Sequence, residues 1–278
     1  MNLVSALRRA AGAVVLLGLM ASVSPARAQG DLLVAPTRVI INGAGNAEVV
    51  LSNIGDKPAT YRISLELRRM EESGDFSEVD ETAATESERA ARDMVRFAPR
   101  RVTLLPGQPQ AVRLSVRPPE GLPDGEYRVH MSFRAIPAAQ LAETAEEAAI
   151  PASGVSIKLT PIYGITIPVF VRQGRLEAQA AIAGTRLVRS EKQSLLEVDM
   201  TRTGKRSVYG ELIGRNSRGE VVFSLRGIAI YPEVDRRKVH VRLNSEQIGK
   251  IQGPLKLEYR DLPENGGALL AEATVTVS

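Results

Sequence analysis

Few side chains of this chain are of the types that perform catalysis. Its two histidines are His130 and His240, and it has no cysteine, so acid–base or metal chemistry would depend on these imidazoles and on carboxylates. Each histidine stands between apolar neighbours in an alternating pattern, which places its ring on the outward face of a strand. A lone histidine in that setting is most often a solvated surface residue. We therefore expect neither histidine to take part in a site.

Sequence motifs of familiar catalytic and nucleotide-binding sites are absent. The chain has no Gly-x-Ser-x-Gly turn, no phosphate loop of the Gly-x-x-x-x-Gly-Lys type and no His-Glu-x-x-His pair. Acidic residues crowd into residues 70–93, which a solvated charge run explains. Carboxylates far apart in sequence can still converge on a substrate, so an exported hydrolase stays an alternative. The motifs favour a protein that is not an enzyme and that uses no cofactor, metal or nucleotide.

One segment has the character of a binding surface. Residues 159–172 read LTPIYGITIPVFVR, and every odd-numbered side chain in them is apolar. The other face is also largely apolar, which is typical of a strand buried on both sides. Pro161 and Pro168 argue against a central position, because proline lacks the N–H donor that a central strand needs. A long apolar strand at an edge is either an aggregation hazard or a docking device for another chain.

The first residues predict an export signal. Two arginines precede an apolar run over residues 10–23 that is too short to span a bilayer, and Ala-Arg-Ala at 26–28 fits the small-x-small site of a signal peptidase. We expect residues 1–28 to be a signal peptide cleaved before Gln29. The mature protein is then expected to be soluble and to work beyond the inner membrane.

Charge gives little support for a nucleic-acid partner. The leader carries three arginines and no acid, so its removal leaves 33 basic residues against 32 acidic ones and lowers the net charge from +4 to +1. Binding of nucleic acid would need a clustered basic face, whereas the basic residues here alternate with apolar ones. Because the chain has no cysteine, its stability outside the cytoplasm must come from core burial alone.

The elements that must position such a strand are themselves strands. Short alternating runs are separated by Gly, Pro and Asn turns, which predicts an all-β protein of two sandwiches, over residues 29–172 and 173–278, with a cleft between them. Two acidic segments depart from this pattern. Residues 70–93 and 138–154 suit a loop, a disordered insert or a short helix, and we interpret both as long loops.

Three groups of residues carry a resemblance to a known family. They are Pro-Thr-Arg-Val-Ile at 36–40, Pro-Arg-Arg-Val at 99–102 followed by Leu-Pro-Gly-Gln at 105–108, and Leu-Pro-Asp-Gly-Glu-Tyr-Arg at 122–128. In this order and spacing they resemble the PapD-like periplasmic chaperones of the chaperone–usher pilus pathway. The resemblance is strong over residues 31–172 and weak over the rest of the chain.

The resemblance implies a fold and a function. The fold would be two immunoglobulin-like β-sandwich domains arranged as a boomerang with an interdomain cleft. The function would be that of an ATP-independent chaperone in the periplasm, which binds, folds and caps pilus subunits by donor-strand complementation and delivers them to an outer-membrane usher. The donor strand would span residues 157–172. Its groove-filling side chains would be Leu159, Pro161, Tyr163, Ile165 and Ile167.

The resemblance also assigns polar residues. Arg38 falls on the family arginine that binds the subunit's C-terminal carboxylate. The family lysine that assists it falls on Pro168, which has neither charge nor donor. Either Arg38 acts alone, another base such as Arg101 takes the place of the lysine, or the carboxylate is held more weakly here.

An interdomain ion pair is the last assignment from the resemblance. Arg172 falls on a family arginine that ties the two domains together, and Glu126 falls on its acidic partner. Glu264 is the expected third member, in the second domain. The ordinary alternative for all three residues is a surface ion pair worth about 0–1 kcal/mol.

One further class of function stays open besides the hydrolase. A two-domain immunoglobulin-like structural or adhesive protein of the envelope would keep its sheet edges blunted, and the apolar row in residues 159–171 speaks against it. Aromatic residues make up only 4% of the chain, which also disfavours an adhesin that stacks on carbohydrate. The identity of the subunit and self-association through the exposed strand are not decided by the sequence.

Overall fold

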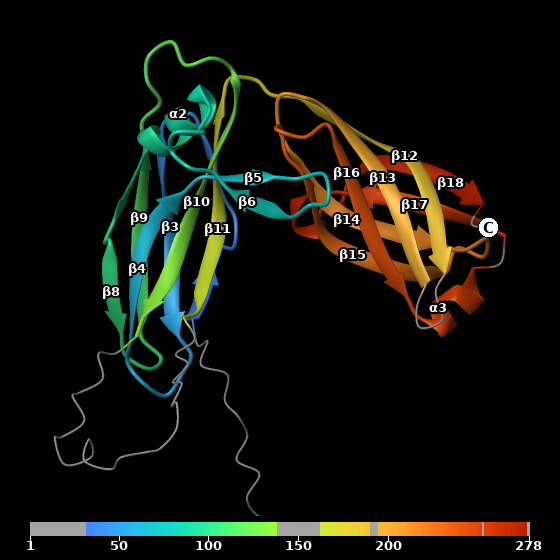
Figure 1. Ribbon diagram of the computed structural model, residues 1–278, viewed down its shortest axis with the longest axis horizontal. Helices are drawn as coiled ribbons and strands as arrows, with labels where there is room; N and C mark the ends of the chain where they lie inside the picture. Colours follow the sequence, from blue (N-terminus) through green and yellow to red (C-terminus); the bar gives the residue numbers. More distant parts are fainter. Residues whose placement is uncertain (1–31, 138–161, 190–193, 252, 277–278) are drawn as a thin grey trace, which may run out of the picture. The chain divides into compact units, whose positions relative to one another are not determined.

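The computed structural model describes residues 32–137, 162–189, 194–251 and 253–276 (Figure 1). The predicted signal peptide and the predicted loop over residues 138–154 lie outside the described residues. Within them the chain is almost entirely β-structure, as predicted. No helix of the described part is long and apolar enough to cross a membrane.

Two sheets build the first sandwich, with the strand orders β1-β3-β9-β7 and β2-β11-β10-β4-β8. This division of strands is that of an immunoglobulin-like sandwich. A second mark of that fold is the hydroxyl of Tyr127, near the start of β10, which donates to the carbonyl of Pro123 at 2.8 Å. The strands are β1 (Leu32–Ala35), β2 (Val39–Asn42), β3 (Gly45–Asn53), β4 (Ala59–Glu66), β7 (Val95–Ala98), β8 (Arg101–Leu104), β9 (Pro109–Val116), β10 (Gly125–Ile136) and β11 (Gly164–Gln173).

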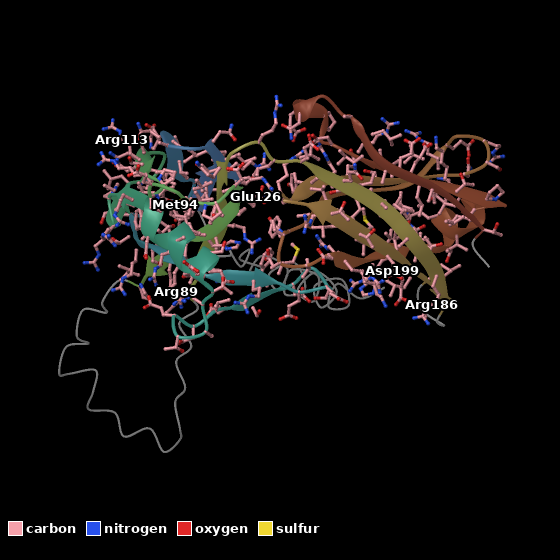
Figure 2. The ribbon with its side chains drawn as sticks, turned by 90° about the horizontal axis from the view of Figure 1, so that it is seen from above. Arg89, Met94, Arg113, Glu126, Arg186 and Asp199 are labelled. Atoms are coloured by element: carbon pink, nitrogen blue, oxygen red, sulfur yellow. The ribbon has the colours of Figure 1, made fainter. Side chains whose placement is uncertain are left out.

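Alternation of apolar and polar residues forms these strands, as β9 illustrates. Val112, Leu114 and Val116 are at most 1% exposed and face the other sheet. Arg113, between them, points to solvent (Figure 2). Such alternation fixes the register of the strand, because a slip by one residue would expose the entire apolar set.

The second sandwich has the sheets β12-β13-β16 and β15-β14-β17-β18. Its apolar side chains form a core of their own around Leu196, Leu212 and Tyr259. Its elements are β12 (Ala178–Arg189), β13 (Ser194–Gly204), β14 (Val208–Arg215), β15 (Val221–Ile230), β16 (Arg236–Leu243), α3 (Ser245–Lys250), β17 (Pro254–Arg260), the 3₁₀ turn η2 (Pro263–Asn265) and β18 (Leu269–Thr276).

The two cores do not share a residue. Buried members of the first lie between Leu32 and Val171, and those of the second between Leu196 and Tyr259. The all-β, two-sandwich fold predicted from the sequence is therefore confirmed. The boundary between residues 172 and 173 and the boomerang arrangement stay predictions. A smaller cluster draws on both parts of the chain and consists of Met70, Phe170, Ala229 and Tyr231.

Residues 70–93 are not the long loop that we predicted. They contribute to the hairpin β5 (Arg68–Met70) and β6 (Phe76–Glu78), and then to helix α2 (Glu86–Met94). Thr85 and Glu88 form a capping box at the start of the helix, and Ala91 and Met94 bury its inner face. The spacing Thr-x-x-Glu at 85–88 was the signal of this helix, and the high density of charged residues concealed it.

The partners of β11 differ along its length. Strand β10 pairs with it from Gly164 to Gln173, whereas the short strand β2 pairs with it, in parallel, only from Val169 to Arg172. Among the described residues, no strand pairs with the other edge of β11 over residues 164–168. Within the described chain, this edge therefore has backbone groups that no partner strand uses and that another strand could pair with.

Replacement of the capping residue of α2 tests the account of residues 70–93. Thr85→Ala removes a side chain that accepts from the backbone N–H of Glu88, and we expect it to lower the free energy of unfolding by about 1 kcal/mol. Urea unfolding followed by circular dichroism measures the change. Ser87→Ala, at an exposed position of the same helix, is the matched control and should leave stability unchanged or slightly raised. Equal losses in both variants would contradict a specific cap.

Candidate functional site

Three residues lie side by side across the sheet just before the start of β2, where its pairing with β11 begins. Val39 pairs with Val169, so Arg38, one residue earlier, lies beside Pro168. On the other side of β11, Pro168 pairs with His130 of β10. Residues opposite one another on neighbouring strands share a face of the sheet. Arg38, Pro168 and His130 therefore belong to one face, next to the unpaired edge of β11.

The guanidinium of Arg38 is held by aromatic rings and hydroxyl groups. It lies 4.1 Å from the ring centre of Phe170 and 4.3 Å from that of Tyr209. Nη1 donates to the hydroxyl of Tyr231 at 3.4 Å, and Nη2 donates to the hydroxyl of Ser207 at 3.3 Å. The side chain is half-buried. It is thus fixed by contacts with two aromatic rings and by hydrogen bonds from two of its nitrogen atoms.

Arg38 forms no ion pair with an acidic residue of the described chain, although many of the described arginines do. A guanidinium carries five N–H donors, and the two hydroxyl groups accept from only two of them. A half-buried cation with three unused donors suits a carboxylate, which can bind it with two parallel hydrogen bonds. The predicted role of Arg38 in carboxylate binding fits this setting, and it stays a prediction.

The interpretation of His130 as a surface residue was wrong. Its side chain is buried, only 4% exposed, and the ring of Phe76 packs edge-on against it at 5.3 Å. Phe76 belongs to the hairpin β5–β6, which covers this face of the sheet and which the sequence did not predict. The Nδ1 atom of His130 has no hydrogen-bond partner among the described atoms. Burial, with the positive charges of Arg128 and Arg68, lowers the pKa of His130 to about 3.

The second histidine lies at the surface. His240 is 44% exposed and lies 3.5 Å from a carboxylate oxygen of Glu197. It is a surface residue, as predicted. In the described part of the chain, no group of three or more His, Asp or Glu side chains is arranged to hold a metal ion.

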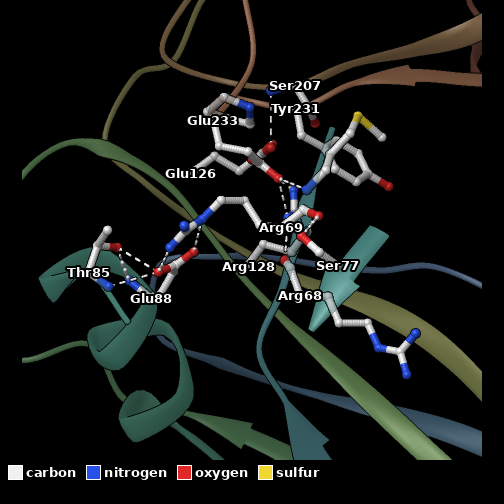
Figure 3. Close-up of polar contacts among 12 residues, drawn as sticks. Arg68, Arg69, Ser77, Thr85, Glu88, Glu126, Arg128, Ser207, Tyr231 and Glu233 are labelled. Carbon is white, nitrogen blue, oxygen red and sulfur yellow. Dashed lines mark hydrogen bonds and ion pairs between the residues drawn. The ribbon is translucent and has the colours of Figure 1, made fainter. Parts of the chain in front are cut away.

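No lysine or arginine takes the position of the family lysine at Pro168. Arg101 lies on β8, at the opposite edge of the sheet from β2, so its proposed role as a substitute was wrong. A second cation on this face is Arg128, which pairs across the sheet with Phe170 and stacks over Tyr231 at 4.1 Å. Arg128 is paired with Glu233, as Figure 3 shows. Its charge is therefore already balanced within the chain.

Glu233 also fixes the hairpin. It accepts a hydrogen bond from the backbone N–H of Met70 at 2.8 Å, in addition to those from Arg128. At the tip of the hairpin, the carbonyl of Glu72 accepts from the backbone N–H of Lys238, on β16, at 2.8 Å. Both contacts lie at the turn end of the hairpin, which is thus attached there to residues of the second sandwich.

The predicted groove-filling residues divide into three groups. Leu159 and Pro161 lie outside the described residues. Tyr163 is exposed, as a groove-filling role requires, and so is its neighbour Ile162, at 44% and 58%. Ile165 is half-buried against the first core, and Ile167 is 2% exposed within it.

The assignment of Ile167 to a partner's groove was therefore wrong, because its side chain is buried in this chain's own core. The assignment of Ile165, whose side chain is only partly buried, stays a prediction. From residue 165 onward the odd-numbered face of β11 turns to the other sheet and completes this chain's own core. The sequence could not separate the two cases, because both faces of the strand are apolar.

The interdomain ion pair forms with a different third member. Arg172 Nε donates to Glu126 Oε2 at 2.9 Å, and the carboxylate of Glu126 is fully buried. Its other oxygen accepts from the backbone N–H of Ser207 at 3.0 Å (Figure 3). Glu264 instead pairs with Arg226, and both side chains are well exposed. Ser207 is therefore the partner from the second sandwich, and the assignment of Glu264 was wrong.

Comparison with solved structures finds chaperones. The chain is similar to the YadV chaperone, with 14% identity, a TM-score of 0.48, and 88% of this chain and 99% of that chain covered. For the CupB2 chaperone of Pseudomonas aeruginosa, the identity is 10%, the TM-score 0.47 and the coverage 88% and 100%. For a chain in the structure of the Salmonella enterica SafA pilin with the SafB chaperone, the values are 14%, 0.43, and 90% and 98%.

No family model matches the chain, and no curated protein matches it. The names of the similar structures agree with the family that the sequence resembles. At these identities and TM-scores the likeness by itself carries no argument about function. The function must therefore be argued from this chain's own residues.

Removal of the buried carboxylate of Glu126 should lower the free energy of unfolding far more than removal of the exposed carboxylate of Glu264. We expect Glu126→Ala to lower the free energy of unfolding by about 3 kcal/mol, because it leaves Arg172 and the N–H of Ser207 without their acceptor. The matched variant Glu264→Ala should change it by less than about 0.5 kcal/mol. Urea unfolding measures both. Similar losses in the two variants would refute the assignment of Ser207 as the third member.

Burial of a neutral histidine predicts a dependence of stability on pH. The folded chain keeps His130 uncharged down to about pH 3, whereas the unfolded chain protonates it below its ordinary pKa of 6.5. The free energy of unfolding should therefore fall as the pH drops from 6.5 towards 3, by at most about 5 kcal/mol from this group.

The variant His130→Phe isolates this contribution. It removes the titrating ring but keeps an aromatic group beside Phe76, so its stability should decline less steeply than that of the wild type between about pH 7 and about pH 4.5. Urea unfolding at a series of pH values provides the comparison. Parallel curves for the two proteins would show that His130 does not titrate as its burial requires.

Proposed function

We propose that this protein is a periplasmic chaperone that binds, folds and caps pilus subunits by lending them a strand. The observation that carries the proposal is the edge of β11 over residues 164–168, which has no partner strand in the described chain and ends at Arg38, a cation without an ion-pair partner among the described residues. An open edge offers backbone hydrogen bonds to an incoming strand. A cation at the end of that edge offers a fixed point for a chain terminus.

The direction of β2 determines which terminus would meet Arg38. Strand β2 runs parallel to β11 and pairs with residues 169–172. An added strand that continues the line of β2 backwards along residues 164–168 would also run parallel to β11. Its carboxyl end would then point to the start of β2, where Arg38 lies. The arrangement thus suits the last strand of a partner, with its C-terminal carboxylate on Arg38.

Exposed apolar side chains next to this edge supply a further source of affinity. Ile162 and Tyr163 directly precede β11 and are 58% and 44% exposed. Burial of one such side chain contributes about 1.5–3 kcal/mol, and each backbone hydrogen bond contributes about 0.5–1.5 kcal/mol. Several such contacts hold a subunit without an energy source, so the proposed chaperone uses no ATP and performs no catalysis.

The remaining parts of the proposal rest on the sequence. The expected signal peptide supports a periplasmic location, and the resemblance to the chaperone–usher family supports delivery to an outer-membrane usher. The alternative, a structural or adhesive protein of the envelope, is disfavoured by the open edge, because such a protein protects its edges against pairing. A second copy of this chain is another partner that the same edge admits.

Capture of subunits from the periplasm tests the proposal. The C-terminally tagged protein is recovered from the periplasm, and the proteins bound to it are identified by mass spectrometry. We expect the wild type to retain a small, exported, β-rich protein that is degraded or aggregated when the chaperone is absent. Arg38→Ala and Tyr163→Asp should each abolish this capture while leaving the circular dichroism spectrum unchanged.

Leu105→Asp is the matched control for the loss of an exposed apolar side chain. Leu105 is 54% exposed and lies in the turn after β8, away from the open edge. This variant should capture the subunit as the wild type does. Wild-type capture by Arg38→Ala and Tyr163→Asp, or recovery of this chain with itself alone, would reject the proposed function.

A further inference from the structure

All hydrogen-bond acceptors of Arg38 in the described chain come from the second sandwich. Ser207 precedes β14, and Tyr231 follows β15. One of the two closest rings, that of Tyr209, also belongs to β14, and only Phe170 comes from the first sandwich. The first sandwich thus provides the charge at the end of the open edge, and the second sandwich determines where that charge lies.

We propose that Ser207 and Tyr231 are positioning residues of the carboxylate site. The inference rests on the proposed function and deepens it. The two hydroxyl groups accept one N–H from each terminal nitrogen of Arg38, so the remaining three donors keep one orientation. A carboxylate then meets a guanidinium that is already aligned for two hydrogen bonds.

Both hydroxyl groups are themselves held in place. Ser207 is 1% exposed, and its backbone N–H donates to Glu126, which Arg172 fixes from the other side. Continuous contacts therefore run from Arg172 through Glu126 and Ser207 to Arg38. Substitution of the Ser207 side chain by a methyl group leaves the backbone contact with Glu126 intact.

Tyr231 is held equally firmly. It is 4% exposed, packs edge-on against Phe170 at 5.4 Å and carries Arg128 over its ring at 4.1 Å. Burial raises the pKa of Tyr231, so its hydroxyl stays protonated and uncharged beside Arg38. It therefore orients the guanidinium without neutralising it, and the positive charge is left for the partner.

A rigid arginine binds more tightly than a mobile one, because the conformational entropy of its long side chain is lost before the partner arrives. Without the two hydroxyl groups Arg38 would keep its charge but sample several orientations. Affinity for a carboxylate should fall, whereas contacts made by the backbone and side chains of an added strand should not change. This difference separates a positioning role from a general structural one.

The test compares two peptides that differ only at the C-terminus. The probe is an acetylated octapeptide of alternating threonine and valine, made with a free carboxylate and with an amide, and binding to the full mature chain is measured by isothermal titration calorimetry. The wild type should bind the carboxylate form more tightly. In the double variant Tyr231→Phe with Ser207→Ala, affinity for that form should fall about tenfold or more, while affinity for the amide form should stay the same.

Tyr127→Phe is the matched control, because it removes a tyrosine hydroxyl that donates to the backbone carbonyl of Pro123 rather than to a group that contacts Arg38. It should keep the wild-type preference for the carboxylate even if it lowers stability. A double variant that also keeps this preference, while Arg38→Ala loses it, would overturn the inference and leave the proposed function intact. A wild type that does not distinguish the two peptides would overturn the inference together with the carboxylate site on which it rests.

Discussion

Strand β2 covers only the last part of β11, and the proposed function depends on this incomplete cover. The backbone of β11 over residues 164–168 is paired on one side by β10 and has no partner strand on the other within the described chain. Soluble proteins usually protect such an edge with charge, proline or a covering element. Here Pro168 removes one donor, but exposed Ile162 and Tyr163 lie beside the open edge. An open edge with exposed apolar neighbours is what the proposed strand addition requires.

At the end of that edge, a small set of buried polar contacts connects the two sandwiches. Glu126 carries no exposed side-chain surface and binds both Arg172 and the backbone of Ser207. Ser207 in turn accepts from Arg38, whose guanidinium lies against Phe170 and Tyr209. Burying a carboxylate is costly unless its oxygens are hydrogen-bonded, so loss of either contact would leave an uncompensated buried charge. The arginine that is left without a carboxylate is thereby held in a defined place.

Sequence patterns predicted the sandwiches well and the polar site only in part. Alternation predicted strands such as β9, because one buried face leaves a clear period of two. The same reasoning misplaced Ile167, because both faces of β11 are apolar and periodicity cannot tell which faces the chain's own core. His130 was misjudged because the hairpin that buries it comes from residues 68–78, and no local pattern reveals such long-range cover. Glu264 was chosen as the third member of the ion pair from its neighbouring residues. In the structure, Glu126 instead accepts from the backbone N–H of Ser207, and a backbone contact leaves no mark in a sequence.

Hydrogen exchange along β11 tests the central claim most directly. Amide exchange of the mature chain would be followed by mass spectrometry, alone and in complex with a captured subunit. Strand addition at the open edge predicts that protection rises over residues 162–168, whereas residues 169–172, already paired on both sides, change little. Unchanged exchange over residues 162–168, with new protection at β8 or at the edge strands β1 and β7, would contradict the account.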